Sequence, residues 1–230
     1  MNILHAYSLS GGARHEFART TWPEPSPEFK DCFTSDAMVK GSWWESRLIV
    51  DDERTVPAIQ RVIGVAADQA EAEADVILLT NDDICFGDNL LPLIAGLNGR
   101  NAYTHRREFK VVDRKLSVAE IQTGARALGV DTFIFTAGWW IDNAHDMPLM
   151  FVGREGWDLI MLKLMKQSNA LRLGACTYHE RHDSYWYQPG VLENNKGNVW
   201  NRARAVEWLK GRGYIDLRMQ DESSFEEDPI

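Results

Sequence analysis

The chain lacks long hydrophobic runs, has few cysteines and is short of basic residues. No stretch approaches 18 consecutive apolar residues, so we expect no transmembrane helix. The three cysteines, Cys32, Cys85 and Cys176, are odd in number and widely spaced, which argues against a disulfide framework and against a cysteine zinc site. The first residues include no basic segment followed by a long apolar one, so no secretory signal is expected. The expected compartment is the reducing cytoplasm.

The shortage of basic residues also limits the partners that we expect. The formal net charge is −9, and an acidic chain repels a phosphate backbone unless it carries a local basic patch. The densest basic stretch, His105-Arg106-Arg107, is short, and Arg106-Arg107 could be a solvated face. Duplex nucleic acid is therefore a weak first choice of partner. A nucleotide is still compatible with this charge, because a metal cation can bridge two negatively charged groups.

The composition, with 44% hydrophobic and 26% charged residues, is typical of a globular protein. Strand-like and helix-like segments alternate, which predicts α/β architecture with a mostly parallel central sheet flanked by helices. We expect strands near residues 3–9, 47–50, 75–80, 101–104, 131–136 and 171–176. We expect helices near residues 15–22, 56–74, 90–97, 117–128, 156–167 and 198–210. One domain over residues 1–220 accounts for all of them, and the acidic tail 221–230 is expected to fray.

The most informative segment is an apolar run that ends in two adjacent carboxylates. Residues 76–80 are typical of a buried strand, and Asn81-Asp82-Asp83 follows directly. In an open α/β sheet, ligands bind just outside the carboxyl ends of the strands. Carboxylates there suit a hard divalent cation, which Mg²⁺ illustrates by combining one or two of them with substrate phosphates. The structural alternative is an Asp-rich turn.

Other polar groups also follow predicted strands. Asp51-Asp52 follows the second strand, and His179 and His182 lie three residues apart in a polar segment. Each has a structural alternative: strand-end aspartates form turns, and paired histidines in a loop are often only solvated. Trp139-Trp140 is more typical of a core than of a sugar-binding wall. Their occurrence along one α/β chain is what favours a functional site.

Four segments together resemble the GT-A class of glycosyltransferases, in particular the nucleotide-diphospho-sugar transferase-like proteins of bacteria, phages and plants. Residues 81–86 stand where such families have a strand-end acidic metal motif, and residues 133–135 resemble a later central strand. Residues 151–158 are similar to a Gly-Arg-x-Gly-Trp-Asp signature that opens a helix. Residues 179–185, with Asn201-Arg202 downstream, resemble a His-x-x-His-Asp element followed by an Asn-Arg pair. A single GT-A-like, Rossmann-like domain is the fold that this resemblance implies.

The resemblance also implies a metal site. Asp83 would hold Mn²⁺ or Mg²⁺ on the diphosphate of a nucleotide-diphosphate sugar, and His182 would complete the site, with His179 as second choice. The usual acidic motif is Asp-x-Asp, whereas this chain has Asn81 at the first position. That departure leaves Asp83 as the main metal ligand and Asp82 as a secondary ligand or a donor-binding residue.

Further roles follow from the same resemblance. Glu155 or Asp158 would lie near the acceptor hydroxyl, as the base or as an orienting group. Asp51 or Asp52 would face the nucleotide base or ribose, and Arg154 would contact the donor. All five are expectations for residues that lie in predicted loops or at predicted helix starts.

The predicted activity is therefore transfer of a sugar from a nucleotide-diphosphate sugar to an unknown acceptor, by a metal-dependent glycosyltransferase. A bound cation neutralises the departing diphosphate, and a carboxylate accepts the proton of the attacking hydroxyl. The acceptor could be a glycan, a small molecule or, less favoured by the charge, modified DNA. Two alternatives stay open: a metal-dependent phosphoester hydrolase, and a non-catalytic domain that binds a nucleotide-sugar or a protein.

Overall fold

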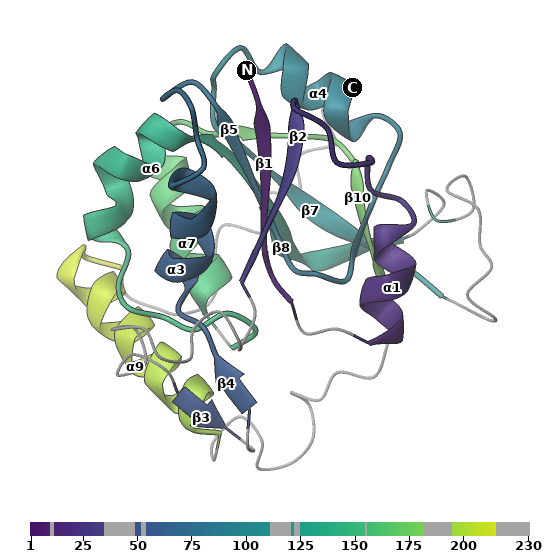
Figure 1. Ribbon diagram of the computed structural model, residues 1–230. Coiled ribbons are helices and arrows are strands. Elements are labelled where there is room, and N and C mark those ends of the chain that lie inside the picture. The colour runs from purple at the N-terminus through teal and green to yellow at the C-terminus, as the bar shows by residue number, and fades with distance from the viewer. Residues whose placement is uncertain are drawn as a thin grey trace.

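A central sheet with helices packed on both faces forms the body of the molecule (Figure 1). The computed structural model describes residues 1–9, 12–34, 49–51, 54–110, 121, 125–154, 156–181 and 195–214. Its strands are β1 (Ile3–Ser8), β2 (Phe29–Thr34), β3 (Ile49–Asp51), β4 (Arg54–Val56), β5 (Val76–Thr80), β6 (Ile84–Phe86), β7 (Ala102–Phe109), β8 (Ala125–Thr136), β9 (Leu171–Arg172) and β10 (Thr177–Glu180). Its helices are α1 (Ala13–Arg19), α3 (Ile59–Ala67), α4 (Leu90–Gly96), α6 (Ala137–Asn143), the 3₁₀ turn η2 (Ala144–Asp146), α7 (Trp157–Gln167) and α9 (Lys196–Gly211).

The strand order in the main sheet is β2-β1-β5-β8-β7-β10-β6, with β9 paired to β7. Strands β1, β2 and β5 are parallel to one another, and β7 is parallel to β9 and β10. Only β8 and β6 run against their neighbours. The predicted α/β fold with a mostly parallel central sheet is confirmed. The reversed strand β8 matters for the site, because its first half lies at the edge where the parallel strands end.

The sheet has to curl to accommodate the link between β5 and β6. Residues 81–83 are all that separates these strands, and three extended residues span only about 10 Å. In a flat sheet, the four strand spacings between β5 and β6 would amount to about 19 Å. The acidic segment therefore lies across one end of the curled sheet, near the first half of β8 and the carboxyl ends of β7 and β10.

Two apolar clusters fill the space on either side of the sheet. One joins the sheet to α3, α6, α7 and α9, and the other joins it to α1 and α4. Strand β5 is continuously apolar because both of its faces are buried: Ile77 and Leu79 face the first cluster, whereas Val76 and Leu78 face the second. A strand that is buried on both faces carries its next residues, the acidic segment, on a rigid support.

Several sequence predictions were wrong in detail. The segment that ends at Asp51 is not a strand of the central sheet; β3 pairs antiparallel with β4 in a separate two-stranded ribbon. The helix expected over 117–128 does not reach its predicted end, since residues 125–128 open the long strand β8. Strands β2 and β10 were missed: β2 follows a run of prolines, and β10 lies in a segment interpreted as a polar loop. The rest of 117–128, apart from residue 121, and the acidic tail lie outside the described residues.

Candidate functional site

The acidic segment lies where the topology places ligand sites. From β1 the chain crosses by α1 to β2 on one side, while β5 pairs on the other side after a crossover that contains α3. Helices α1 and α3 pack against opposite faces of the sheet. In open α/β sheets, ligands bind outside the carboxyl ends of the two strands where the winding reverses in this way. Residues 81–83 follow β5 directly, so they lie at that position.

Asp83 meets a histidine from the carboxyl-terminal third of the chain. Strand β10 pairs with β6 so that His179 lies opposite Ile84, the residue after Asp83. This register brings Nε2 of His179 to 3.3 Å from Oδ2 of Asp83. Both side chains are mostly buried but keep some exposure at the sheet edge. The structure thus unites two residues that the sequence assigned to one site; their role as metal ligands stays a prediction.

The spacing of these two atoms is compatible with a shared cation. Two neighbouring ligands of an octahedral ion with bonds of about 2.1 Å lie about 3 Å apart, close to the observed 3.3 Å. Within the described part of the chain, no group of three or more His, Cys, Asp or Glu side chains is arranged to hold a metal. His182, the other predicted ligand, lies outside the described residues. Asp83 and His179 therefore fit as two ligands of a site.

Asp82 faces α1 instead of His179. The residue is buried, and its carbonyl oxygen accepts a hydrogen bond of 3.0 Å from Nδ1 of His15. The same ring nitrogen lies 3.8 Å from the Asp82 carboxylate. These contacts tie α1 to the acidic segment, so the two adjacent aspartates have different surroundings. Of the two aspartates, Asp83 is the one beside the histidine of β10.

Helix α1 also brings a cation to Asp83. The Nε atom of Arg14 lies 3.6 Å from Oδ2 of Asp83, the same oxygen that His179 approaches. The Arg14 side chain is 43% exposed, against 17% for Asp83. No local pattern selects Arg14 or His15, because they lie about 70 residues away from Asp82 and Asp83 in the chain and only the packing of α1 brings them near.

A second polar cluster surrounds Asp131 on the reversed strand β8. Arg106 donates a hydrogen bond of 2.6 Å from Nη1 to Asp131, and its Nη2 lies 3.2 Å from Glu108. The side-chain amide of Asn81 donates to the other Asp131 oxygen at 3.3 Å. Asn81 thereby connects this cluster to the acidic segment. Arg106 is a mostly buried ion-pair partner, so the interpretation of Arg106-Arg107 as a solvated face was wrong for Arg106.

Asp158 lies in the electrostatic field of that cluster, in the first turn of α7. Burial and the negative charge of Asp131 raise the pKa of the Asp158 carboxyl to about 6, although the Leu159 amide and Arg106 oppose the shift. The Leu159 amide donates a hydrogen bond of 2.9 Å to Asp158 Oδ1. A carboxylate with a pKa near neutrality is suited to accept a proton, and perturbed pKa values cluster at functional sites.

The backbone before α7 depends on glycine. Gly156 has φ of 94°, in the left-handed region that favours glycine, and it places Trp157 and Asp158 at the start of the helix. Nearby, a Cβ on Gly197 of α9 would lie only 2.9 Å from Cδ of Arg154. The side chain of Asn201 accepts from the Phe151 amide at 2.8 Å and donates to its carbonyl at 2.9 Å. The signature segment is therefore fixed against α9.

The remaining predicted residues divide into three groups. Arg154 packs on α9, and its guanidinium donates to the carbonyl of Gly153 at 2.8 Å. Asp51 ends β3 in the separate ribbon, which removes the reason for placing it at a central strand end. Asp52 and Glu155 lie outside the described residues. Their proposed contacts with donor and acceptor stay predictions.

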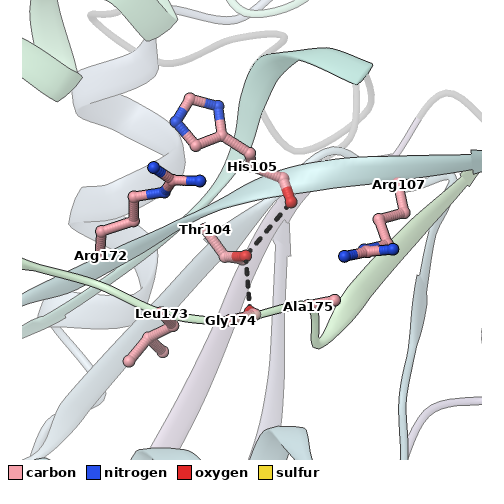
Figure 2. A pocket seen from close by; sticks show the side chains of 7 residues that line it. All are labelled: Thr104, His105, Arg107, Arg172, Leu173, Gly174 and Ala175. Carbon is pink, nitrogen blue, oxygen red and sulfur yellow. Dashed lines mark hydrogen bonds between the residues drawn. The ribbon is translucent and has the colours of Figure 1, made fainter. Parts of the chain in front are cut away.

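The small hollow in Figure 2 lies between β7 and the segment formed by β9 and residues 173–175. It is lined by Thr104, His105, Arg107, Arg172, Leu173, Gly174 and Ala175. The Thr104 hydroxyl lies 3.1 Å from the Gly174 carbonyl and 3.2 Å from that of His105. Its free volume of about 10 Å³ holds roughly one water molecule and is too small for a sugar.

Among the described residues, no helix is long and apolar enough to cross a membrane.

Comparison with known proteins yields structural likenesses of low identity. No family model matches the chain, and no curated protein matches it at a significant level. A solved structure of S. aureus TarS 1–349 in complex with UDP-GlcNAc is similar over 91% of this chain and 72% of that one, with 14% identity and a TM-score of 0.49. Another structure of TarS 1–349 matches over 96% and 77%, with 13% identity and a TM-score of 0.44. A structure of S. aureus TarS matches over 99% and 46%, with 15% identity and a TM-score of 0.46. The chain is similar to these structures at a level that assigns it neither a family nor an activity.

Proposed function

We propose that this protein is a metal-dependent glycosyltransferase that uses a nucleotide-diphosphate sugar as donor. The observation that carries the proposal is the approach of Asp83 and His179 to 3.3 Å beside the carboxyl end of β5. The resemblance of residues 81–86, 151–158 and 179–185 to glycosyltransferase motifs supports it. The acceptor in this proposal is a glycan or a small molecule.

Each part of the site would have a distinct role. Asp83 and His179, with His182 as the third ligand, would hold Mn²⁺ or Mg²⁺. That ion would supply positive charge to the departing diphosphate. Asp158 would accept the proton of the attacking hydroxyl, because a carboxyl with a pKa of about 6 is mostly ionised at pH 7 yet still basic enough to be protonated. Glu155 is the alternative for that role.

The Asp131 cluster would support Asp158 without binding substrate. Asp131 raises the proton affinity of Asp158 through its charge, whereas Arg106 opposes it. Since Arg106 also pairs with Asp131, the ion pair limits how far the Asp158 pKa rises. Asp131 and Arg106 would thus act as positioning residues that keep the pKa of the Asp158 carboxyl not far below pH 7.

Ligand binding and turnover test the proposal directly. Thermal unfolding is measured with UDP-, GDP- and TDP-sugars, with Mn²⁺ and with EDTA, because a ligand that binds only the folded state raises its apparent stability. A donor is expected to raise Tm with Mn²⁺ and not with EDTA, and the protein should hydrolyse or transfer the sugar of that donor. Asp83→Asn should weaken metal-dependent binding by about 30-fold or more, as expected when one partner of a buried charge pair is removed.

Asp142→Asn is the matched control, since it removes an exposed carboxylate of α6 and should leave donor binding unchanged. Absence of metal-dependent binding to every sugar nucleotide would contradict the proposal. Hydrolysis of a generic phosphomonoester without any sugar nucleotide would indicate a phosphoester hydrolase instead.

A further inference from the structure

One oxygen of Asp83 is approached by two nitrogen groups from different parts of the chain. Oδ2 lies 3.3 Å from Nε2 of His179 on β10 and 3.6 Å from Nε of Arg14 on α1. The Arg14 contact is an ion pair longer than a good hydrogen bond, and its side chain is 43% exposed. A long, exposed side chain can leave such a contact without disturbing the core.

The guanidinium and a divalent cation compete for the negative charge of this oxygen. A cation held by Asp83 and His179 would have Arg14 as a positively charged neighbour, and like charges repel. This repulsion favours movement of Arg14 away from Asp83 when the ion binds. A donor diphosphate arriving with the ion offers negative oxygens beside the same position, and the fork of an arginine matches phosphate geometry.

We infer that Arg14 exchanges partners: it pairs with Asp83 when no donor is bound and with the donor diphosphate when the metal and donor are bound together. This inference rests on the proposed function and extends it to a residue on α1. In the donor-free protein, Arg14 competes with the metal for Asp83. In the ternary complex it stabilises the donor. Arg14 therefore makes binding of the metal and of the diphosphate positively cooperative, which links their affinities reciprocally.

The inference predicts effects of opposite sign for a single substitution. Arg14→Ala removes the competitor, so Mn²⁺ alone should bind about fivefold more tightly. The same substitution removes a phosphate contact, so UDP at saturating Mn²⁺ should bind about tenfold more weakly. Arg14→Lys keeps the charge but loses the fork, and should fall between wild type and Arg14→Ala in both measurements. Isothermal titration calorimetry measures both affinities.

Arg19→Ala is the matched control. Arg19 lies on the same helix, is also exposed, and pairs with Asp31 at 3.8 Å instead of with Asp83. Its substitution changes the net charge by the same amount and should leave both affinities within about twofold of wild type. If Arg19→Ala shifts them as Arg14→Ala does, the effect belongs to overall charge and the exchange is refuted.

The remaining outcomes separate the exchange from the proposed function. Wild-type protein that binds neither Mn²⁺ nor any of UDP, GDP and TDP would contradict the proposed function and, with it, the exchange; if GDP or TDP binds in place of UDP, that nucleotide is used in both measurements. Wild-type protein that binds UDP equally well in EDTA and in Mn²⁺ would refute the exchange, since no ion then displaces Arg14. Metal-dependent UDP binding in wild type, with both affinities unchanged in Arg14→Ala, would leave the function standing and refute the exchange alone.

Discussion

Two histidine–aspartate pairs of similar geometry lie in different regions of this molecule. Nδ1 of the buried His5 ring is 3.4 Å from Asp31, and Nε2 of His179 is 3.3 Å from Asp83 at the sheet edge. His5 has no exposed surface, its other nitrogen lies 2.8 Å from the Thr80 hydroxyl, and aromatic rings surround it. Each aspartate also has an exposed arginine nearby, Arg19 for Asp31 and Arg14 for Asp83, so the pairs differ in their histidines: the His5 ring belongs to the core, whereas the His179 ring reaches the sheet edge.

The burial of the histidine, and not the residue types, distinguishes the structural pair from the candidate functional pair. Burial lowers the pKa of His5, and the hydrogen bond and charge of Asp31 only partly oppose that shift. A neutral, enclosed imidazole has no route to a ligand. The His179 ring instead keeps some exposure at the edge where residues 81–83 cross the curled sheet, whereas the two aspartates are exposed to a similar degree. Substitution of the two histidines should therefore have different effects on stability.

The largest effect is expected for His5→Ala. It removes a fully buried ring and leaves the Thr80 hydroxyl without this partner, so the free energy of unfolding should fall by about 3 kcal/mol. Urea unfolding at pH 7.5 measures the loss. Because the folded pKa of His5 is lowered, the unfolded chain takes up more protons below pH 6.5, and this contribution to stability is lost as the pH falls through that value.

The His5→Ala variant should accordingly lose less stability than wild type between pH 7.5 and pH 5.5. A pH dependence equal to that of wild type would show that His5 does not titrate differently in the folded and unfolded states.

A smaller effect of opposite sign is expected for Asp158→Asn. The folded pKa of about 6 lies above the ordinary value of 3.8, so the charged carboxylate destabilises the folded state increasingly as pH rises from about 4 to 6. At pH 7.5 the substitution should raise the free energy of unfolding by about 1–3 kcal/mol, since a shift of one unit corresponds to 1.36 kcal/mol. Unfolding at pH 7.5 and at pH 4 measures the difference, which should nearly vanish at the lower pH.

Asp158→Asn should also lower sugar transfer, because the amide cannot accept the proton of the acceptor. A variant that is less stable at pH 7.5 and fully active would remove Asp158 from the proposed role. A residue that reduces stability while serving a reaction is typical of functional sites.

The smallest effect on stability is expected for His179→Ala. Its ring lies at the sheet edge, so the free energy of unfolding should fall by only about 1 kcal/mol, well below the loss for His5→Ala. Binding of Mn²⁺ should weaken by more than about tenfold, measured by calorimetry. Equal losses of stability for His5→Ala and His179→Ala would break the comparison between the two pairs.

Periodicity predicted the local elements well where one face or both faces of a segment are apolar. The strand before Asn81, the helix that starts near Trp157 and the last helix lie where the sequence placed them. Strand β2 was missed because neighbouring prolines suggested a loop. The end of the helix expected over 117–128 is part of β8, whose pairing with β5 and β7 overrides the local pattern.

The site followed a similar division. The sequence selected Asp83, Asp158 and His179, and the structure places Asp83 beside His179. The sequence did not select Asp131 as a site residue. An aspartate at the start of a strand lies at the carboxyl ends of the neighbouring strands only if that strand is antiparallel to them, as β8 is. The sequence did not select Arg14, because no local pattern shows that α1 packs on the acidic segment.

The amino-acid sequence was enough to predict that a buried strand carries carboxylates at its end, that strands and helices alternate, and that a helix starts near Trp157-Asp158. These features depend on the order of apolar and polar side chains along a few neighbouring residues. The tertiary structure was needed to show which aspartate faces a histidine and which charges surround Asp158. Those answers depend on strand order, the reversal of β8 and the curl that the short link 81–83 imposes, because these join segments that lie 50 to 100 residues apart in the chain.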